Sequence, residues 1–190
     1  PRSTQTSTLF PYTALFRSGG DTIAAMTQSF ANRNVGTGKT INATGVVTDG
    51  NSGNNYNVTF AANSTGVITV RSITVTAATD TKVYDGNTTS TGTPTVTLGS
   101  LVGGDTVGSM TQSFANRNVD TGKTINATGV VTDGNSGNNY NVTFTPNATG
   151  VITVRSITVT AGTDTKVYDG GTTSTGTPTV TLGSLVGGDT

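Results

Sequence analysis

Lysine, asparagine and aspartate recur close together in this sequence, and these side chains could form a covalent crosslink. The side-chain amine of Lys82 or Lys123, once deprotonated with the help of an Asp, could attack the side-chain amide of a nearby Asn to form an isopeptide bond with loss of ammonia. The spacing alone does not establish such a bond. The many Ser and Thr hydroxyls have no His or Glu to activate them as nucleophiles, because the sequence contains neither residue.

A glycine- and asparagine-rich stretch, residues 133–138, has the outline of a calcium-binding loop. It begins Asp-Gly-Asn-Ser-Gly-Asn, but Gly137 stands where the loop pattern needs Asp or Asn. Its twelfth position is Phe144 in place of the bidentate Glu. We therefore interpret the stretch as a turn in which Gly and Asn supply positive φ angles, and we predict no metal site.

The tripeptide Tyr84-Asp85-Gly86 could contact a ligand, but turn chemistry explains each of its residues. We expect Tyr84 to pack at a sheet edge, Asp85 to accept local N–H bonds and Gly86 to complete the turn. Tyr84 and Tyr140 are also the aromatic candidates for a sugar-binding platform in this part of the chain. Seven Asn residues match the N-x-[ST] acceptor pattern, although chance produces many such matches in this composition: Asn42, Asn57, Asn63, Asn87, Asn126, Asn141 and Asn147.

The absent residue types exclude several functions. Without Cys and His there are no thiol nucleophiles, no zinc sites and no imidazole bases. We predict that the protein is not an enzyme, with no catalytic residue and no cofactor. No basic cluster indicates nucleic-acid binding, and no apolar run of about 18 residues indicates membrane insertion.

The composition favours strands and turns as the elements that position these residues. Thr and Val favour strands, whereas the 26 Gly and the many Asn favour the turns between them. We predict an all-β fold of small antiparallel sandwich modules of the immunoglobulin-like kind, with a β-grasp-like sheet as the alternative. About seven short strands are expected in each complete module.

The sequence repeats itself with an offset of 84 residues. Residues 21–106 align with residues 105–190 with nine differences, among them Gly36/Asp120 and Asn87/Gly171. In residues 151–160 the alternation of apolar residues changes phase at Arg155-Ser156, which marks either a bulge or the passage from one module to the next. We prefer the second reading. It gives a C-terminal part of a module at 19–72, a complete module at 73–156 and an N-terminal part at 157–190.

Several spaced motifs of this unit resemble the YDG-type repeat domains of large secreted bacterial proteins, notably filamentous-haemagglutinin-like adhesins. The matching motifs are Lys82-Val83-Tyr84-Asp85-Gly86, Gly103-Gly104-Asp105, Phe114-Ala115-Asn116-Arg117-Asn118-Val119, Gly122-Lys123-Thr124 and Gly137-Asn138-Asn139-Tyr140. The resemblance implies an extracellular or cell-surface location and a structural role in tandem, with neighbouring copies of the module as partners. It implies no catalytic residues. Host glycans or proteins, bound through avidity, are the alternative partners.

Residues 8–18, Thr-Leu-Phe-Pro-Tyr-Thr-Ala-Leu-Phe-Arg-Ser, differ in composition from everything that follows. They match the translation of a common sequencing adapter except at Ala14, so we interpret residues 1–18 as non-native and the chain as a piece of a longer array. The two partial modules hold complementary halves. We expect their unpaired strand edges to associate with other chains and the central module to be the best ordered part.

Overall fold

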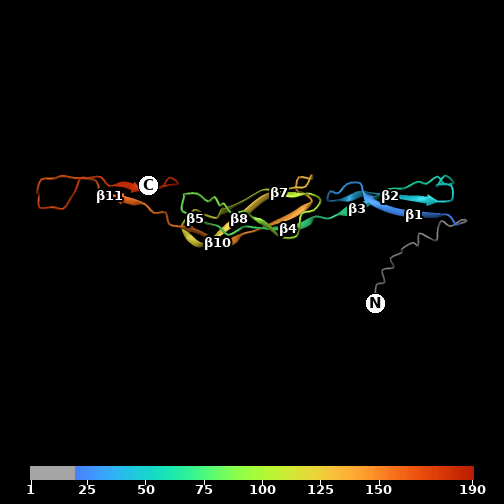
Figure 1. Ribbon diagram of the computed structural model, residues 1–190, viewed down its shortest axis with the longest axis horizontal. Helices are drawn as coiled ribbons and strands as arrows, with labels where there is room; N and C mark the ends of the chain where they lie inside the picture. The colour runs from blue at the N-terminus through green and yellow to red at the C-terminus, as the bar shows by residue number, and fades with distance from the viewer. Residues whose placement is uncertain (1–19) are drawn as a thin grey trace, which may run out of the picture. The chain divides into compact units, whose positions relative to one another are not determined.

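The computed structural model describes residues 20–190, so the adapter-like residues 1–18 lie outside it. The described residues form strands and turns, and no helix among them is long and apolar enough to cross a membrane. The chain divides into two compact units, residues 1–70 and 71–190. The prediction of an all-β fold is confirmed (Figure 1).

The first unit contains one antiparallel sheet of three strands in the order β1-β2-β3. Its strands are β1 (Thr22–Phe30), β2 (Gly36–Thr48) and β3 (Asn63–Ile68). A bulge interrupts the β1–β2 register between Ala24 and Thr27. Most side chains of this sheet are exposed, including Phe30 at 41% and Val46 at 61%. The sheet has strand pairing without a closed core.

The second unit begins with seven strands that form two sheets. They are β4 (Arg71–Thr76), β5 (Thr81–Val83), β6 (Thr95–Leu98), β7 (Thr106–Phe114), β8 (Asp120–Thr132), β9 (Tyr140–Thr145) and β10 (Asn147–Thr153). One sheet has the order β5-β10-β8-β7 and the other the order β6-β4-β9. Two strand pairs, β4 with β9 and β5 with β10, are parallel. The sheets are therefore mixed, whereas the sequence suggested purely antiparallel pairing.

Alternating apolar residues bring the two sheets together. On β4, Ile73 and Val75 are buried while Ser72 is exposed and Thr74 only half-buried. One core cluster joins this strand and the residue after it to the opposite sheet: Val75, Ala77, Phe114, Ile125, Ala127 and Ile152. A second cluster contains Ile73, Val131 and Tyr140. Among residues 20–190, every buried apolar side chain of the core thus lies between residues 73 and 152.

The last part of the second unit is a short hairpin. β11 (Thr158–Thr160) pairs antiparallel with β12 (Thr179–Leu182), as β4 pairs with β6 one repeat earlier. Val159 is 58% exposed, whereas its equivalent Val75 is fully buried. The same hairpin sequence therefore forms its local pairing here without the second sheet that would bury it.

Candidate functional site

The Tyr-Asp-Gly motif lies in a turn directly after β5, and its residues are held by local bonds. Lys82 makes an ion pair with Asp85 at 2.7 Å and also donates to the carbonyl oxygens of Asn87 and Thr89. The hydrogen bond from Lys82 is the main reason that the pKa of Asp85 lies below its ordinary value. Gly86 has a φ of 80°, a left-handed conformation that favours glycine. The expectation of a turn is confirmed.

The tyrosine of this motif reaches beyond the turn. Tyr84 packs against the core cluster of Val75 and Phe114, and its hydroxyl donates to Asp189 Oδ2 at 2.7 Å. That hydrogen bond is the main cause that raises the pKa of the Tyr84 phenol. Asp189 belongs to the third copy of the Gly-Gly-Asp motif, after those that end at Asp21 and Asp105. Both motifs are visible in the sequence, but their contact is not predictable from it.

The other recurring tyrosine, Tyr140, is an internal brace of the module. Only 7% of its side chain is exposed. Its hydroxyl accepts a bond from the backbone N–H of Val102 at 3.0 Å and donates to Asp105 Oδ2 at 2.8 Å. Burial, with the hydrogen bond to Asp105, raises the pKa of the phenol. Tyr140 is therefore a core residue, and its ring is not an exposed platform for a sugar.

The calcium-like loop is organised by the Asp133 carboxylate. Oδ1 accepts N–H bonds from Asn135 at 2.7 Å and Gly137 at 2.8 Å, and Oδ2 accepts one from Asn139 at 3.0 Å. Burial by itself would raise the pKa of Asp133, but these backbone bonds outweigh it, and the pKa lies below its ordinary value. The carboxylate thus closes the turn. Within residues 20–190, no group of three or more acidic side chains is placed to hold a metal ion.

The two lysines considered for crosslinking both lie beside asparagines. Lys123, only 7% exposed, places Nζ 2.6 Å from Asn116 Oδ1. Lys82 places Nζ 2.9 Å from Asn87 Oδ1. One repeat later Gly171 replaces Asn87, and Lys166 pairs with Asp169 at 3.0 Å. A crosslink from Lys82 therefore could not recur in every copy, whereas one from Lys123 stays an open prediction.

The acceptor-pattern asparagines are surface residues with one exception. Asn147 is half-buried, and its amide nitrogen donates to Ala77 O at 3.3 Å. The remaining six side chains are exposed: Asn42, Asn57, Asn63, Asn87, Asn126 and Asn141. Exposure makes these six accessible, and their modification stays a prediction.

Two grooves of about 390 and 250 Å³ lie on the first unit. Ile23, Met26, Val58 and Phe60 are among the lining residues of the larger groove. In the second unit Met110 and Val142, the equivalents of Met26 and Val58, pack against the core cluster that includes Val75 of β4. Phe144, the equivalent of Phe60, lies in β9, which pairs with β4. The groove therefore occupies the place that a core strand fills in the complete module, so its shape does not indicate a small-molecule site.

No curated protein and no solved structure matches the chain. One family model matches, and it covers residues 69–149, the segment from the end of β3 to the start of β10. The match agrees with the resemblance inferred from the Lys-Val-Tyr-Asp-Gly, Gly-Gly-Asp and Asn-Asn-Tyr motifs. The matching model is that of the YDG domain, and the chain therefore contains a YDG domain.

Proposed function

We propose that this chain is a spacer segment of a large secreted or surface-anchored bacterial adhesin, in which tandem YDG modules extend a distal binding region. The observation that carries the proposal is closure of the core within one repeat length. Both core clusters are built from β4 to β10, and the sequence of the next copy follows after Thr153. A module that buries its own core can be added to an array without altering its neighbours.

The exposed strand faces suit a spacer in an aqueous environment. Pairs of threonine hydroxyls bridge neighbouring strands at 2.9 Å between Thr111 and Thr128 and at 2.6 Å between Thr76 and Thr97. Such cross-strand pairs stabilise a sheet while the hydroxyls stay hydrated. The array gains a polar surface with few charges, which supports an extended structural role.

An enzymatic role has little support. The sequence lacks His, Cys and Glu, which serve most often as general bases and nucleophiles. The buried polar side chains all serve the fold: Gln112 bonds to the Ala78 backbone, Lys123 to Asn116, and Asp133 to its own turn. Glycan binding through repeated tyrosines is also less favoured, because Tyr140 is buried and the Tyr84 hydroxyl is engaged by Asp189.

The proposal is tested by the dimensions of arrays that contain different numbers of modules. Small-angle scattering of chains with two, four and six copies should give a maximum dimension that increases in proportion to copy number. A maximum dimension that levels off as copies are added would contradict the spacer role. A glycan-array screen on the four-copy chain tests the alternative, and specific binding that disappears on changing exposed tyrosines would favour it.

A further inference from the structure

Three motifs that lie far apart in the sequence meet around the Asp189 carboxylate. Arg117, from the turn after β7, places Nη2 3.1 Å from Asp189 Oδ1. The Tyr84 hydroxyl donates to Asp189 Oδ2 at 2.7 Å. Arg117 Nη1 also donates to the carbonyl oxygen of Gly187 at 2.8 Å. Both oxygens of one carboxylate and one carbonyl of the Gly-Gly-Asp loop are thus bound by the YDG turn and its neighbouring arginine.

Two glycines allow the backbones to approach at this point. A Cβ atom added to Gly86 would lie 2.5 Å from Gly187 Cα, and one added to Gly187 would lie 2.7 Å from Gly86 Cα. Both distances are too short for any side chain. The glycine of the Tyr-Asp-Gly motif and the first glycine of the Gly-Gly-Asp motif are therefore both required by the contact, in addition to their positive φ angles.

In its other two copies, the aspartate of the Gly-Gly-Asp motif bonds to a different tyrosine, at a different sequence distance. Asp105 Oδ2 accepts from Tyr140, 35 residues later, and Asp21 Oδ2 accepts from Tyr56 at the same spacing. Asp189 is the equivalent of Asp105 one repeat later, and its partner Tyr84 lies 105 residues earlier. One spacing lies inside a module, and the other crosses from one module to the module before it.

We propose that in tandem modules each Gly-Gly-Asp aspartate bridges two tyrosines, the Asn-Asn-Tyr tyrosine of its own module and the YDG tyrosine of the preceding one. The interaction surface is the YDG latch, which we define as Tyr84, Gly86 and Arg117. Its occupant is the Gly-Gly-Asp loop of the next module, here Gly187–Asp189. The inference rests on the proposed function only in requiring tandem modules, and it assigns the family's characteristic turn the task of fixing each junction.

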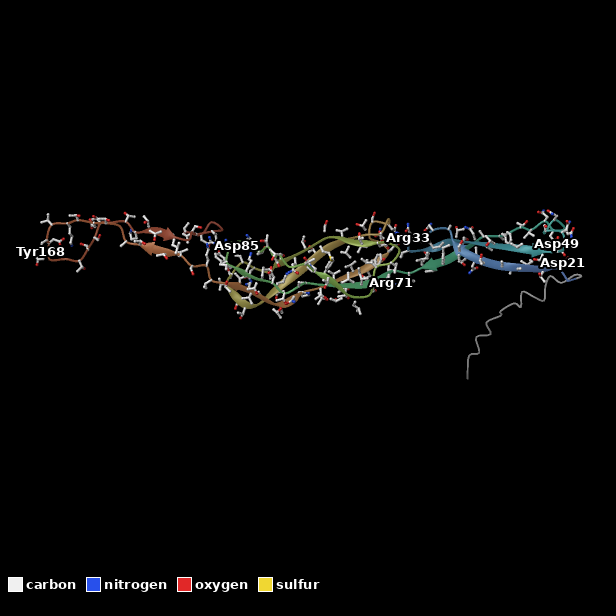
Figure 2. All side chains as sticks on the ribbon, viewed as in Figure 1. Asp21, Arg33, Asp49, Arg71, Asp85 and Tyr168 are labelled. Carbon is white, nitrogen blue, oxygen red and sulfur yellow. The ribbon has the colours of Figure 1, made fainter. Side chains whose placement is uncertain are left out.

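The second copy of the Tyr-Asp-Gly motif, residues 168–170, shows the turn without this occupant. Tyr168 is equivalent to Tyr84, but it is 95% exposed and lies in the loop between β11 and β12 (Figure 2). A Cβ atom at Gly170, the equivalent of Gly86, would meet nothing within 4 Å. Because Gly170 has a φ of 73° and Gly86 a φ of 80°, alanine is strained to a similar extent at both positions. The substitution meets a neighbouring module only at Gly86.

The 190-residue chain permits a direct test because it has no cysteine. Spin labels are attached at Asn126→Cys on β8 and Thr179→Cys on β12, both exposed positions, and their separation is measured by pulsed electron paramagnetic resonance. We expect a single narrow distance distribution in the parent chain, at least a twofold broadening in Gly86→Ala, and no broadening in Gly170→Ala. Circular dichroism melting of each variant confirms that the central module stays folded.

A second pair of variants leaves the backbone unchanged. Tyr84→Phe removes only the hydroxyl that donates to Asp189 and should broaden the distribution, whereas Tyr168→Phe should not. A broad distribution in the parent chain, or equal widths in the parent, Gly86→Ala and Tyr84→Phe, overturns the latch. The spacer function is judged separately by scattering of longer arrays, so a narrow distribution in a compact array would overturn that function and leave the latch standing.

Discussion

The hydroxyl of Tyr140 lies 2.8 Å from the carboxylate of Asp105 and 3.0 Å from the backbone nitrogen of Val102, which ties β9 to the loop before β7. Its equivalent Tyr56 also bonds to Asp21, but it is 43% exposed, against 7% for Tyr140. Tyr140 and Tyr56 therefore make the same hydrogen bond to the equivalent aspartate, but only Tyr140 is buried.

This difference predicts unequal effects of removing the two hydroxyls. Tyr140→Phe removes the acceptor of the Val102 N–H and one donor to Asp105 at a ring that is only 7% exposed, so it should lower the free energy of unfolding of the central module by about 1 to 2 kcal/mol. Tyr56→Phe should change it by less than about 0.5 kcal/mol, because water replaces the lost bond. Urea denaturation at pH 7, followed by circular dichroism, measures both. Equal losses in the two variants would contradict the assignment of Tyr140 as a buried brace.

Phe114 and Phe30 provide a matched test of core closure. Phe114 is 2% exposed within the core cluster, whereas Phe30, at the equivalent position, is 41% exposed. Phe114→Ala should cost about 3 to 5 kcal/mol of stability, because it removes buried surface and leaves a cavity. Phe30→Ala should leave unfolding of the central module unchanged within about 0.5 kcal/mol. Thermal and urea unfolding of both variants decide the matter, and a large effect of Phe30→Ala would show a core shared with the first unit.

The Asp133 turn predicts loss of stability in acid. The pKa of Asp133 is lower in the folded state than in the unfolded state, where it is about 3.9. The ionised carboxylate therefore stabilises the fold above the unfolded pKa, and this stabilisation is lost as the pH falls through the folded pKa. Urea midpoints should fall between pH 5 and pH 2.5. Asp133→Asn should lower the midpoint at pH 7 and flatten this dependence. Asp49→Asn, in the equivalent turn of the first unit, should leave the midpoint of the central module unchanged.

The exposed partial modules predict association between chains. Residues 157–161 have the same sequence as residues 73–77, which contribute to the core of the complete module. The groove on the first unit lies where a segment equivalent to residues 73–77 would pack. Strand addition would bury Val159, now 58% exposed. We expect the mass measured by light scattering to increase with concentration, and Val159→Lys to shift this increase to higher concentration. A constant monomer mass at millimolar concentration would refute the prediction. Val119→Lys, at another exposed valine, is the control.

Local chemistry in the sequence was sufficient to predict the turns and several strands. β1–β2 and β7–β8 have a bulge at the same place, although only the second pair belongs to a closed core. Asp49 and Asp133 accept the same three backbone bonds in their turns. These features recur in both settings because each involves residues close in sequence. The motifs were also sufficient to recognise the YDG domain.

The parallel strand pairs and the latch could not be derived from the sequence. Periodicity indicates which face of a strand is buried but not the direction of its partner, so the pairing of β4 with β9 and of β5 with β10 was not foreseen. The contact of Tyr84 with Asp189 spans 105 residues. The recurrence of both motifs was the available signal, but recurrence does not reveal which copies meet.

Two identical pentapeptides show that local sequence alone does not decide whether a segment becomes a strand. Residues 140–144, Tyr-Asn-Val-Thr-Phe, form most of β9, whereas the same letters at residues 56–60 form no strand. β9 pairs with β4 alone, and the described part of the first unit contains no counterpart of β4. The sequence determined the alternation and the turns through short-range bonds. Whether the pentapeptide became a strand depended on a partner about 70 residues away, because an extended segment needs a neighbour for its backbone hydrogen bonds.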